Sequence, residues 1–274
     1  MLNSVNTNMG AMVALQSLNA TNNALNTTQK RISTGFRVND AKDDGAAFAV
    51  AQAVRADVAG LTAANEQLGG VKGILDTAIA GLTKVSETMV KVRETLVRLA
   101  DDTLNADQRA QYTAQYTALR TEIQNFIADA TYNGRTLLST GAGGGDIVTT
   151  RNENGTTYTI TAVDGAGTLV VAAAPGTAAA AQTALGAGGD FATVETAVSN
   201  ALNSFGSVSR YIDAQISYNK TKADALESGL GALIDADLAK ESARLQSLQI
   251  RQQLGTQALS IANQAPQTLL SLFR

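Results

Sequence analysis

The sequence predicts a mainly α-helical protein in which long, coiled-coil-like helices from both termini pack antiparallel, with a small β-region inserted between them. Three patterns lead to this prediction. Apolar residues repeat at heptad spacing from Leu61 to Leu99, which is typical of a coiled coil. Both termini carry apolar residues at helical spacing without any acidic residue. Between the helical parts, residues 139–190 hold 11 of the 24 glycines.

Composition favours assembly over catalysis. Residues 1–39 and 242–274 carry six basic residues and no acidic one, so all 24 carboxylates lie between them. The chain has no cysteine and no histidine, which removes disulfides, the commonest transition-metal ligands and the usual base at neutral pH. We therefore expect no enzyme activity, no metal and no cofactor. A net charge of −3 gives no basic footprint for nucleic acid, and no apolar run is long enough to cross a membrane.

The first predicted helix covers residues 3–33. Its apolar face is expected to hold Val5, Met9, Met12, Leu15, Leu18, Leu25 and Ile32, with the polar Asn22 and Gln29 among them. Gly35 suits the end of this helix. Asp40 is expected to cap the following helix, with Asp43 and Asp44 in its first turn, where the helix dipole favours acids. Capping accounts for these acids without a catalytic carboxylate pair.

The second predicted helix, from about residue 42 to residue 100, has the strongest periodicity. Two heptad positions are filled over six heptads, one by Leu61, Leu68, Leu75, Leu82, Met89 and Leu96, the other by Ala64, Val71, Ala78, Val85, Val92 and Leu99. Asn105 and Gln108 have the spacing of a capping box, which opens a third helix to about residue 129. Its apolar face carries Tyr112, Tyr116, Leu119, Ile123 and Ile127. Tyr132-Asn133-Gly134 predicts a turn.

Residues 139–190 read as a small β-region. Short strands are predicted at 147–150, 156–163 and 168–172, joined by turns at Asn154-Gly155 and Asp164-Gly165. Residues 173–189 are rich in alanine, glycine and threonine and are predicted to form an exposed loop.

Helical spacing returns from about residue 191. The apolar face there holds Val194, Val198, Leu202, Phe205, Val208, Ile212 and Ile216. After Gly229 and Gly231, a last helix is predicted from about Asp235, with Pro266 interrupting it near its end. One heptad position of this helix holds Leu238, Leu245, Gln252 and Leu259, and the neighbouring row holds Leu248 and Ala262. The two ends of the chain are expected to lie side by side.

Three separate blocks resemble bacterial flagellin. Residues 31–52 read RISTGFRVNDAKDDGAAFAVAQ, which is similar to the turn between the first two flagellin helices. Residues 131–138 read TYNGRTLL, similar to the turn before the flagellin variable region, and residues 262–274 read ANQAPQTLLSLFR, similar to the flagellin C-terminus. The resemblance covers residues 1–138 and 191–274, with the blocks in the family's order.

The resemblance implies an extracellular subunit of the flagellar filament, which serves motility. In flagellins the paired terminal helices form the inner core of a hollow filament, a surrounding tube is built from the longer helices, and the variable region faces outward. Carried onto this chain, the division is 1–40 and 234–274 for the inner core, 41–138 and 191–233 for the tube, and 139–190 for the variable region. The short variable region implies a subunit without large outer domains.

The resemblance also implies partners. Flagellins polymerise helically with themselves or with sister flagellins. They are exported unfolded by the flagellar type III apparatus, with an export chaperone and without a cleaved signal peptide, fold on assembly, and are added next to a distal cap and hook-associated proteins. The residues expected in self-assembly are Leu18, Leu25, Ile32, Arg37, Asn39, Asp40, Asp43, Leu238, Leu245, Leu259, Asn263, Gln264, Pro266, Leu269, Leu272 and Arg274.

Two further sites follow from the same resemblance. Residues 89–95, MVKVRET, are similar to the segment of enteric-type flagellins that an innate immune receptor reads. Lys91 and Thr95 replace arginine and leucine there, and lysine lacks the planar guanidinium, which puts recognition by that receptor in doubt. As in some flagellins, threonines of the variable region are candidates for O-glycans, although threonine also suits strands and loops without any glycan, and this second interpretation is favoured for each single site. The candidates are Thr149, Thr150, Thr156, Thr157, Thr168 and Thr177.

Two alternatives to a filament subunit stay open at the level of the sequence. A hook–filament junction protein of the same superfamily shares the N-terminal block, although the C-terminal block favours the filament. A cytoplasmic coiled-coil adaptor would account for the heptads but not for the matching terminal blocks.

Overall fold

The computed structural model describes the backbone of residues 7–272 and the side chains of residues 7–264. The described elements, in chain order, are α1 (Met9–Thr34), α2 (Gly45–Leu99), α3 (Ala106–Asp129), β1 (Ile147–Thr150), β2 (Thr157–Ile160), α4 (Gly165–Thr168), α5 (Ala178–Leu185), α6 (Asp190–Ile234) and α7 (Leu238–Leu272). The chain divides into two compact units, which we call the terminal unit (residues 1–56 and 225–274) and the central unit (residues 57–224). Helices α2 and α6 contribute to both. The predicted fold class is confirmed.

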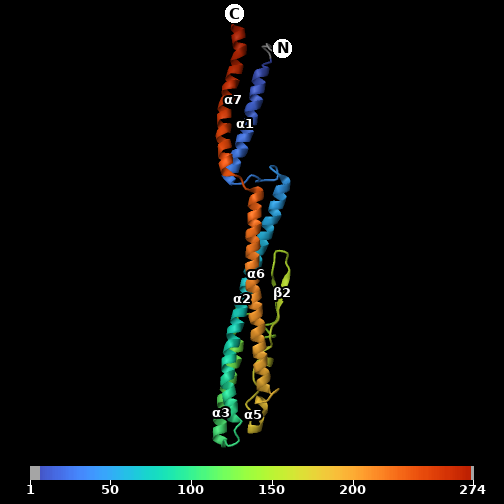
Figure 1. Cartoon of the computed structure of the whole chain (residues 1–274), viewed down its shortest axis with the longest axis vertical. Coiled ribbons are helices and arrows are strands. Elements are labelled where there is room, and N and C mark those ends of the chain that lie inside the picture. Colours follow the sequence, from blue (N-terminus) through green and yellow to red (C-terminus); the bar gives the residue numbers. More distant parts are fainter. Residues whose placement is uncertain (1–6, 273–274) are drawn as a thin grey trace. The chain divides into compact units, whose positions relative to one another are not determined.

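In the terminal unit, α1 and α7 lie side by side and antiparallel (Figure 1). The side chain of Asn8 caps α1 by accepting a hydrogen bond from the backbone of Ala11. Gly35 ends α1 in the left-handed conformation, with φ of 77°, which glycine adopts without strain. The side chain of Asp237 caps α7 by accepting from the backbone of Ala239 and Lys240. The prediction that the two ends meet is confirmed.

The cap of α2 differs from the prediction. Asp44, and not Asp40, caps the helix, because its side chain accepts from the backbone N–H groups of Ala46 and Ala47. Asp40 instead closes a turn ahead of the helix by accepting from the backbone of Lys42. Asp40 therefore closes the turn before α2, whereas Asp44 caps α2 itself.

The central unit has one core between α2, α3 and α6. Each of the twelve heptad residues predicted from Leu61 to Leu99 is at most 8% exposed, which confirms that pattern. Ion pairs from Lys72 to Asp213 and from Arg93 to Glu195 join α2 to α6. Since the partner number falls as the α2 number rises, the two helices run antiparallel.

Helix α3 begins and ends where the sequence predicts. The capping box of Asn105 and Gln108 is complete, with both side chains accepting from the opposite backbone N–H. Beyond the helix, Asn133 and Gly134 both have positive φ, 49° and 72°, between the bridged residues Tyr132 and Arg135. This is the predicted turn, and it places the Tyr132 ring against Gly73 of α2.

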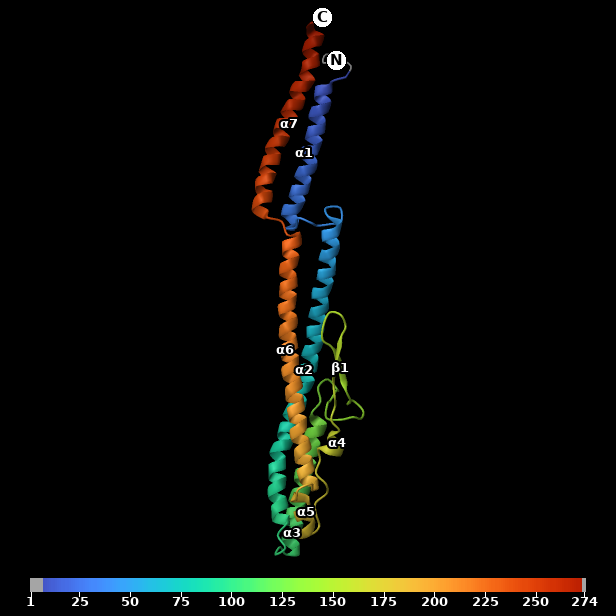
Figure 2. The ribbon, with the colours of Figure 1, turned by 45° about the vertical axis from the view of Figure 1, so that its right-hand side comes forward.

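The β-region contains one hairpin among the described residues. Strand β1 has the predicted bounds, whereas β2 is shorter than predicted and pairs with β1 antiparallel, Ile147 opposite Ile160. Figure 2 shows the hairpin beside α2 and α6. Its turn is held there by buried Asn219 of α6, which donates to the Arg151 carbonyl and to Asn65 of α2, both over 2.9 Å.

Two predictions in the rest of this region are wrong. Residues 168–172 form no strand, because the side chain of Asp164 accepts from the Gly167 backbone and starts the short helix α4 instead of a hairpin turn. Residues 173–189 are not all loop, since Thr177 caps α5. Alanine has the highest helix propensity, and Ala178 and Ala181 are buried. Packing against the core therefore makes this alanine-rich stretch helical, although it lacks a long apolar pattern.

The last two helices also continue further than predicted. Helix α6 passes through Gly229 and Gly231 without a break and ends at Ile234. Helix α7 begins at Leu238 and runs to Leu272, so Pro266 does not interrupt it. None of the described helices has a stretch both long and apolar enough to cross a membrane.

Candidate assembly interface

The inner faces of α1 and α7 form a narrow seam with heptad spacing. On α1, the positions that keep this spacing, all buried or half-buried, are Ala11, Ala14, Leu18, Thr21, Leu25, Thr28 and Ile32. On α7 they are Glu241, Leu245, Leu248, Gln252, Gly255, Leu259 and Ala262. An added Cβ on Gly255 would lie 3.2 Å from a methyl of Leu18. Of the predicted seam leucines on α7, Leu245 and Leu259 are half-buried, whereas Leu238 is 50% exposed.

Polar side chains fix the register of this seam. The Gln252 amide donates to Asn22 across the seam over 2.8 Å. Near the free end of α1, the Asn8 amide donates to the Ala262 carbonyl over 2.7 Å. Such pairs specify alignment at some cost in stability, and they agree with the polar seam predicted at Asn22. Gln29, predicted on the same face, is exposed.

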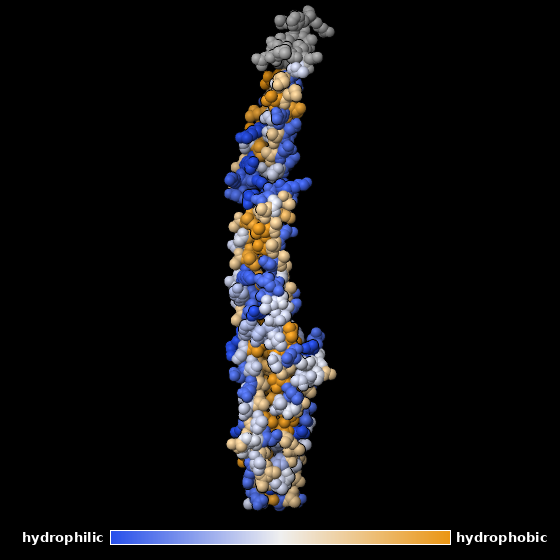
Figure 3. Space-filling model, turned by 90° about the vertical axis from the view of Figure 1, so that its right-hand side faces the viewer, coloured by the Kyte–Doolittle hydropathy of each residue, from blue (hydrophilic) through white to orange (hydrophobic). Residues whose placement is uncertain are grey.

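The outer faces of the pair carry large apolar side chains that are exposed among polar ones. Exposed large side chains there, from 48% to 69% exposed, are Met9, Met12, Val13 and Leu15 of α1 and Ile250, Leu254 and Ile261 of α7. Met9, Met12 and Leu15 were predicted on the seam and lie outside it, because the 3.6-residue turn brings Ala11 and Ala14 inward instead. Figure 3 shows apolar surface on this α1–α7 pair. Exposed apolar surface gathered in one region marks an interaction site.

A backbone junction joins α1, α6 and α7 at the base of the pair. Phe36 and Asp235 form an antiparallel bridge, and the Ala236 N–H donates to the Gly35 carbonyl over 2.9 Å. The Arg37 N–H donates to the Ile234 carbonyl, and its guanidinium donates to the Leu233 carbonyl, each over 2.6 Å. Arg37 thereby satisfies carbonyls that the end of α6 leaves unpaired. Arg37, which was predicted to take part in self-assembly, therefore ties the end of α6 to the residues that follow α1.

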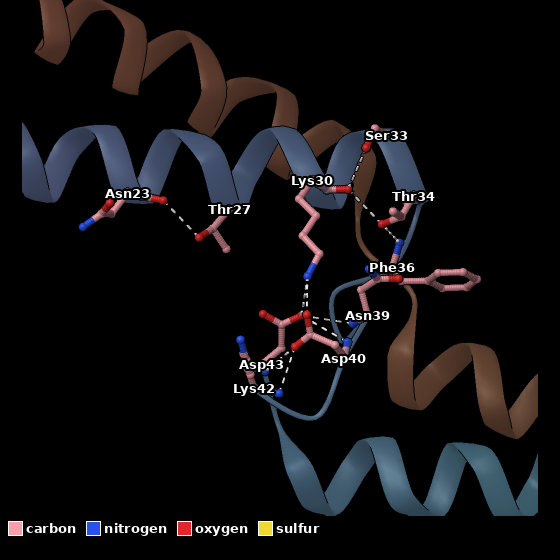
Figure 4. A network of polar contacts seen from close by, with 10 residues as sticks. All are labelled: Asn23, Thr27, Lys30, Ser33, Thr34, Phe36, Asn39, Asp40, Lys42 and Asp43. Carbon is pink, nitrogen blue, oxygen red and sulfur yellow. Dashed lines mark hydrogen bonds and ion pairs between the residues drawn. The ribbon is translucent and has the colours of Figure 1, made fainter.

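Lys30 connects the end of α1 to the loop before α2 (Figure 4). Its ammonium lies 2.6 Å from Asp40 and 3.7 Å from Asp43. The Asp43 carboxylate also accepts from the Asn39 N–H over 3.1 Å. The hydrogen bond from Lys30 holds the pKa of Asp40 below its usual 3.8, and the same bond raises the pKa of Lys30 above 10.5. The predicted Asn39, Asp40 and Asp43 thus belong to one network.

A second ion pair joins α1 to α7 directly. The Arg31 guanidinium lies 3.3 Å from Glu241, whose side chain is 10% exposed. Arg31 stands in the last turn of α1 and Glu241 in the first turn of α7, where the helix dipoles favour those charges. Sequence analysis did not single out this pair, although Glu241 is the last acid before the acid-free end.

The remaining residues predicted for self-assembly lie towards the end of α7. Asn263 and Gln264 are exposed. Pro266, Leu269 and Leu272 belong to the helix, but their side chains lie outside the described part of the chain, as does the whole of Arg274. Their expected part in assembly therefore stays a prediction.

The candidate glycosylation sites differ in exposure. Thr156, Thr157, Thr168 and Thr177 are exposed, and Thr150 is half-buried. Thr149 is 4% exposed, which shields its hydroxyl within this chain. Thr177 uses its hydroxyl to cap α5, and Thr168 donates to the Asp164 carbonyl. Thr156 and Thr157 lie next to the hairpin turn, and neither of their hydroxyls has a hydrogen-bond partner in the described part of the chain.

Residues 89–95 divide between core and surface. Met89, Val92 and Thr95 are buried, and the Thr95 hydroxyl donates to the Lys91 carbonyl over 2.9 Å. Arg93 is engaged twice within the subunit, because it pairs with Glu195 and lies over the Phe191 ring at 5.3 Å. Within this segment, three side chains therefore belong to the core and Arg93 joins α2 to α6.

The described residues contain no cluster of three or more acidic, histidine or cysteine side chains suited to a metal ion. What the terminal unit offers instead is a helical pair with an incompletely covered apolar surface. Its chemistry is that of a protein–protein contact.

Comparison with known proteins agrees with this character. Residues 5–142 match the family model of the bacterial flagellin N-terminal helical region, and residues 192–273 match that of the C-terminal helical region. Flagellin FljK of Caulobacter vibrioides is 39% identical, covering 100% of this chain and 99% of that protein. A flagellin of Brucella melitensis is 35% identical, with 99% of each covered.

More distant similarities include one curated protein and one solved structure. Flagellin C of Rhizobium meliloti is 28% identical over the whole of both chains. The crystal structure of Bacillus cereus flagellin is 21% identical, covers 66% of this chain and 94% of that one, and has a TM-score of 0.35, a likeness too weak to bear on the fold.

Proposed function

Because this chain belongs to the bacterial flagellin family and is a structural subunit of the flagellar filament, we propose that its α1–α7 pair forms the inner layer of that filament. The observation that carries the proposal is the row of exposed apolar side chains on the outer faces of α1 and α7. In the filament, neighbouring copies of the pair cover these faces. Flagellins are located in the extracellular filament, and so is this subunit.

Burial within a single pair is too small to hold it firmly. Ordering a residue costs roughly 1–2 kcal/mol in backbone entropy, whereas a fully buried leucine returns about 1.5–3 kcal/mol. Only Leu25 and Leu248 are buried apolar side chains on the described part of the pair. Contacts with other subunits therefore supply much of the stability, and the pair folds fully on assembly.

The charges of the ends suit such a layer. Apart from Glu241, which pairs with Arg31, the α1–α7 pair has no acidic residue, so few like carboxylates come together when many copies gather around one axis. A filament also needs a contact in which one face of a subunit meets a different face of the next, because such a contact does not close on itself. The outer faces of α1 and α7 differ in sequence and suit a contact of that kind.

Export and growth follow from the same proposal. A chain whose ends fold on assembly suits export in the unfolded state through the flagellar type III apparatus, with a chaperone that shields those ends. The subunit is then added next to the distal cap, and hook-associated proteins lie at the ends of the filament. The short β-region lies outermost, and its exposed Thr156 and Thr157 are the positions that we propose for O-glycans. The hook–filament junction and adaptor alternatives are not favoured, since the full-length relatives are named flagellins.

Replacing outer apolar residues tests the proposal. The double variant Leu254→Gln, Ile261→Gln should leave the isolated subunit unchanged, because both side chains are already more than half exposed. Its polymerisation should fail, measured by sedimentation and electron microscopy of filaments. The matched control is Val148→Gln, which makes the same kind of change at a side chain 62% exposed in β1. Normal filaments from the double variant would overturn the proposal.

Removing residues 242–274 is the coarser version of this test. The truncated chain should stay soluble with a folded central unit and should not polymerise. All six tyrosines, at positions 112, 116, 132, 158, 211 and 218, lie in the central unit. Tyrosine fluorescence therefore reports on that unit alone and separates loss of assembly from loss of folding.

A further inference from the structure

The chain contains two Asn-Gly pairs, and both stand in exposed turns. Asn133-Gly134 lies between α3 and β1, and Asn154-Gly155 lies at the hairpin turn between β1 and β2. The φ angles of the two glycines are nearly equal, 72° and 73°. In an Asn-Gly pair the glycine nitrogen can reach the asparagine side-chain carbonyl, because no Cβ on the glycine hinders it. As isolated dipeptides the two pairs have the same reactivity.

Their hydrogen bonds differ. At the hairpin turn, the Asn154 amide donates to Glu153 over 3.2 Å, and Glu153 is held in turn by Lys222. The Gly155 N–H donates to the Asn152 carbonyl over 3.3 Å. Both reacting groups of this pair are therefore engaged, and a group that is hydrogen-bonded must break that bond before it reacts.

At the other turn the reacting groups are free. Within the described part of the chain, neither the Asn133 side chain nor the Gly134 N–H has a hydrogen-bond partner. The bonds of this turn belong to its flanks, where Tyr132 and Arg135 exchange backbone hydrogen bonds of 2.8 and 3.0 Å. They close the turn without restraining the two groups inside it.

We propose that Asn133 is a site of spontaneous deamidation and isomerisation, and that Asn154 is protected. The Gly134 backbone nitrogen loses its proton and attacks the Asn133 side-chain carbonyl carbon. A carbon–nitrogen bond forms, and the side-chain nitrogen leaves as ammonia, which gives a cyclic imide. Water then opens the ring at either carbonyl and leaves aspartate or isoaspartate. The net change exchanges ammonia for water, a gain of one mass unit.

The product alters a structural contact. Isoaspartate places one additional carbon in the backbone of the turn and so disrupts the paired hydrogen bonds of Tyr132 and Arg135. Those bonds hold the Tyr132 ring against Gly73, where an added Cβ would lie 2.9 Å from the ring. Modification therefore loosens the turn from α2, while the aspartate form only adds a carboxylate beside the exposed Arg135.

Peptide mass spectrometry tests the difference between the two turns. The purified full chain is incubated in mildly alkaline buffer, digested with trypsin, and the peptides that contain Asn133 and Asn154 are followed over time. Variants Asn133→Asp and Asn154→Asp provide elution standards for the aspartate forms. The Asn133 peptide should gain one mass unit several-fold faster than the Asn154 peptide, and part of it should elute apart from the standard as isoaspartate.

Two controls decide whether the structure sets the difference. In denaturant the two rates should converge, because both turns are lost. In the variant Glu153→Ala, the rate at Asn154 should rise while the rate at Asn133 stays the same. Equal rates in the native chain, or faster reaction at Asn154, would overturn the proposal.

Discussion

The α1–α7 pair and the central unit use the same heptad spacing but differ in burial. In the central unit Leu61, Leu68, Leu75 and Leu82 are 0% exposed, because α3, α6 and the β-region together cover the heptad face of α2. In the terminal pair Leu18, Leu245 and Leu259 are only half-buried, since each helix has one neighbour along its length. A heptad therefore predicts which residues face a partner, and the number of partners decides how deeply they are buried.

Leucine truncation should separate the two regions most strongly. Leu82→Ala should lower the free energy of unfolding of the central unit by about 2–5 kcal/mol, because it opens a cavity in a closed core. Leu18→Ala should cost the isolated subunit about 1 kcal/mol, because its side chain is only partly removed from water. Denaturant titration followed by tyrosine fluorescence reports the first change, and far-ultraviolet circular dichroism reports the second.

The same pair of variants has a further expected difference in assembly. Leu18→Ala should raise the subunit concentration needed for polymerisation, since filament contacts complete the burial of α1. Equal losses of stability in the two isolated variants would contradict the difference in burial.

The Arg31–Glu241 pair should be the most sensitive polar contact of the terminal unit. Glu241→Ala leaves the partly buried Arg31 guanidinium without a carboxylate, and losing one partner of a buried pair costs roughly 3 kcal/mol. The helical signal of the terminal unit should then melt earlier, while tyrosine fluorescence is unchanged. Lys240→Ala, next to it on α7 and exposed, is the matched control and should have little effect.

Glycine replacement compares tightness of packing in the two regions. A Cβ on Gly81 would lie 2.8 Å from the Ala130 methyl and 3.2 Å from the Phe126 carbonyl, so Gly81→Ala should destabilise the central unit by about 1–3 kcal/mol. A Cβ on Gly255 meets only the Leu18 side chain, and its nearest contact is with a flexible terminal methyl at 3.2 Å. Gly255→Ala should therefore be neutral or stabilise α7 by up to about 1 kcal/mol through helix propensity.

Thermal melts of the two variants measure this contrast. A marked loss of stability in Gly255→Ala would show that the seam is as closely packed as the central core.

The smallest expected effect is the response of the terminal unit to acid. The pKa of Asp40 is lowered from 3.8 by its hydrogen bond from Lys30. The contribution of this carboxylate to the stability of the terminal unit is therefore complete when the pH is above the pKa of the unfolded chain. It is lost as the pH falls through the lower pKa of the folded state. Lys30 has a raised pKa, so its contribution is lost only as the pH rises above 10.5. Asp40→Asn should weaken the terminal unit near neutral pH and flatten its loss of stability in acid.

Circular dichroism melts over a series of acidic buffers check this outcome. Glu227→Gln, at an exposed acid of α6 without an ion pair in the described part of the chain, is the control. A control that flattens the acid response as much as Asp40→Asn would remove the assignment to the Lys30–Asp40 contact.

Features that depend on neighbouring residues were predictable. The heptad of α2, the capping box of Asn105 and the turn at Asn133-Gly134 each follow from patterns a few residues long, and all are confirmed. Errors arose where a short motif has two outcomes. Asp164-Gly165 fits a hairpin turn or a helix start, and Asp40 and Asp44 are both acceptable caps. Contacts elsewhere in the chain decided between them.

The sequence by itself determined the helical ends, the heptad core and the family, because these depend on residue types at fixed spacing. Only the tertiary structure decided which face of α1 meets α7, that Arg37 satisfies the end of α6, and that Arg31 pairs with Glu241. Those contacts join residues about 200 positions apart in the sequence, and no pattern among neighbouring residues predicts them. The same holds for the two Asn-Gly pairs, which are alike as dipeptides and differ only in what surrounds them.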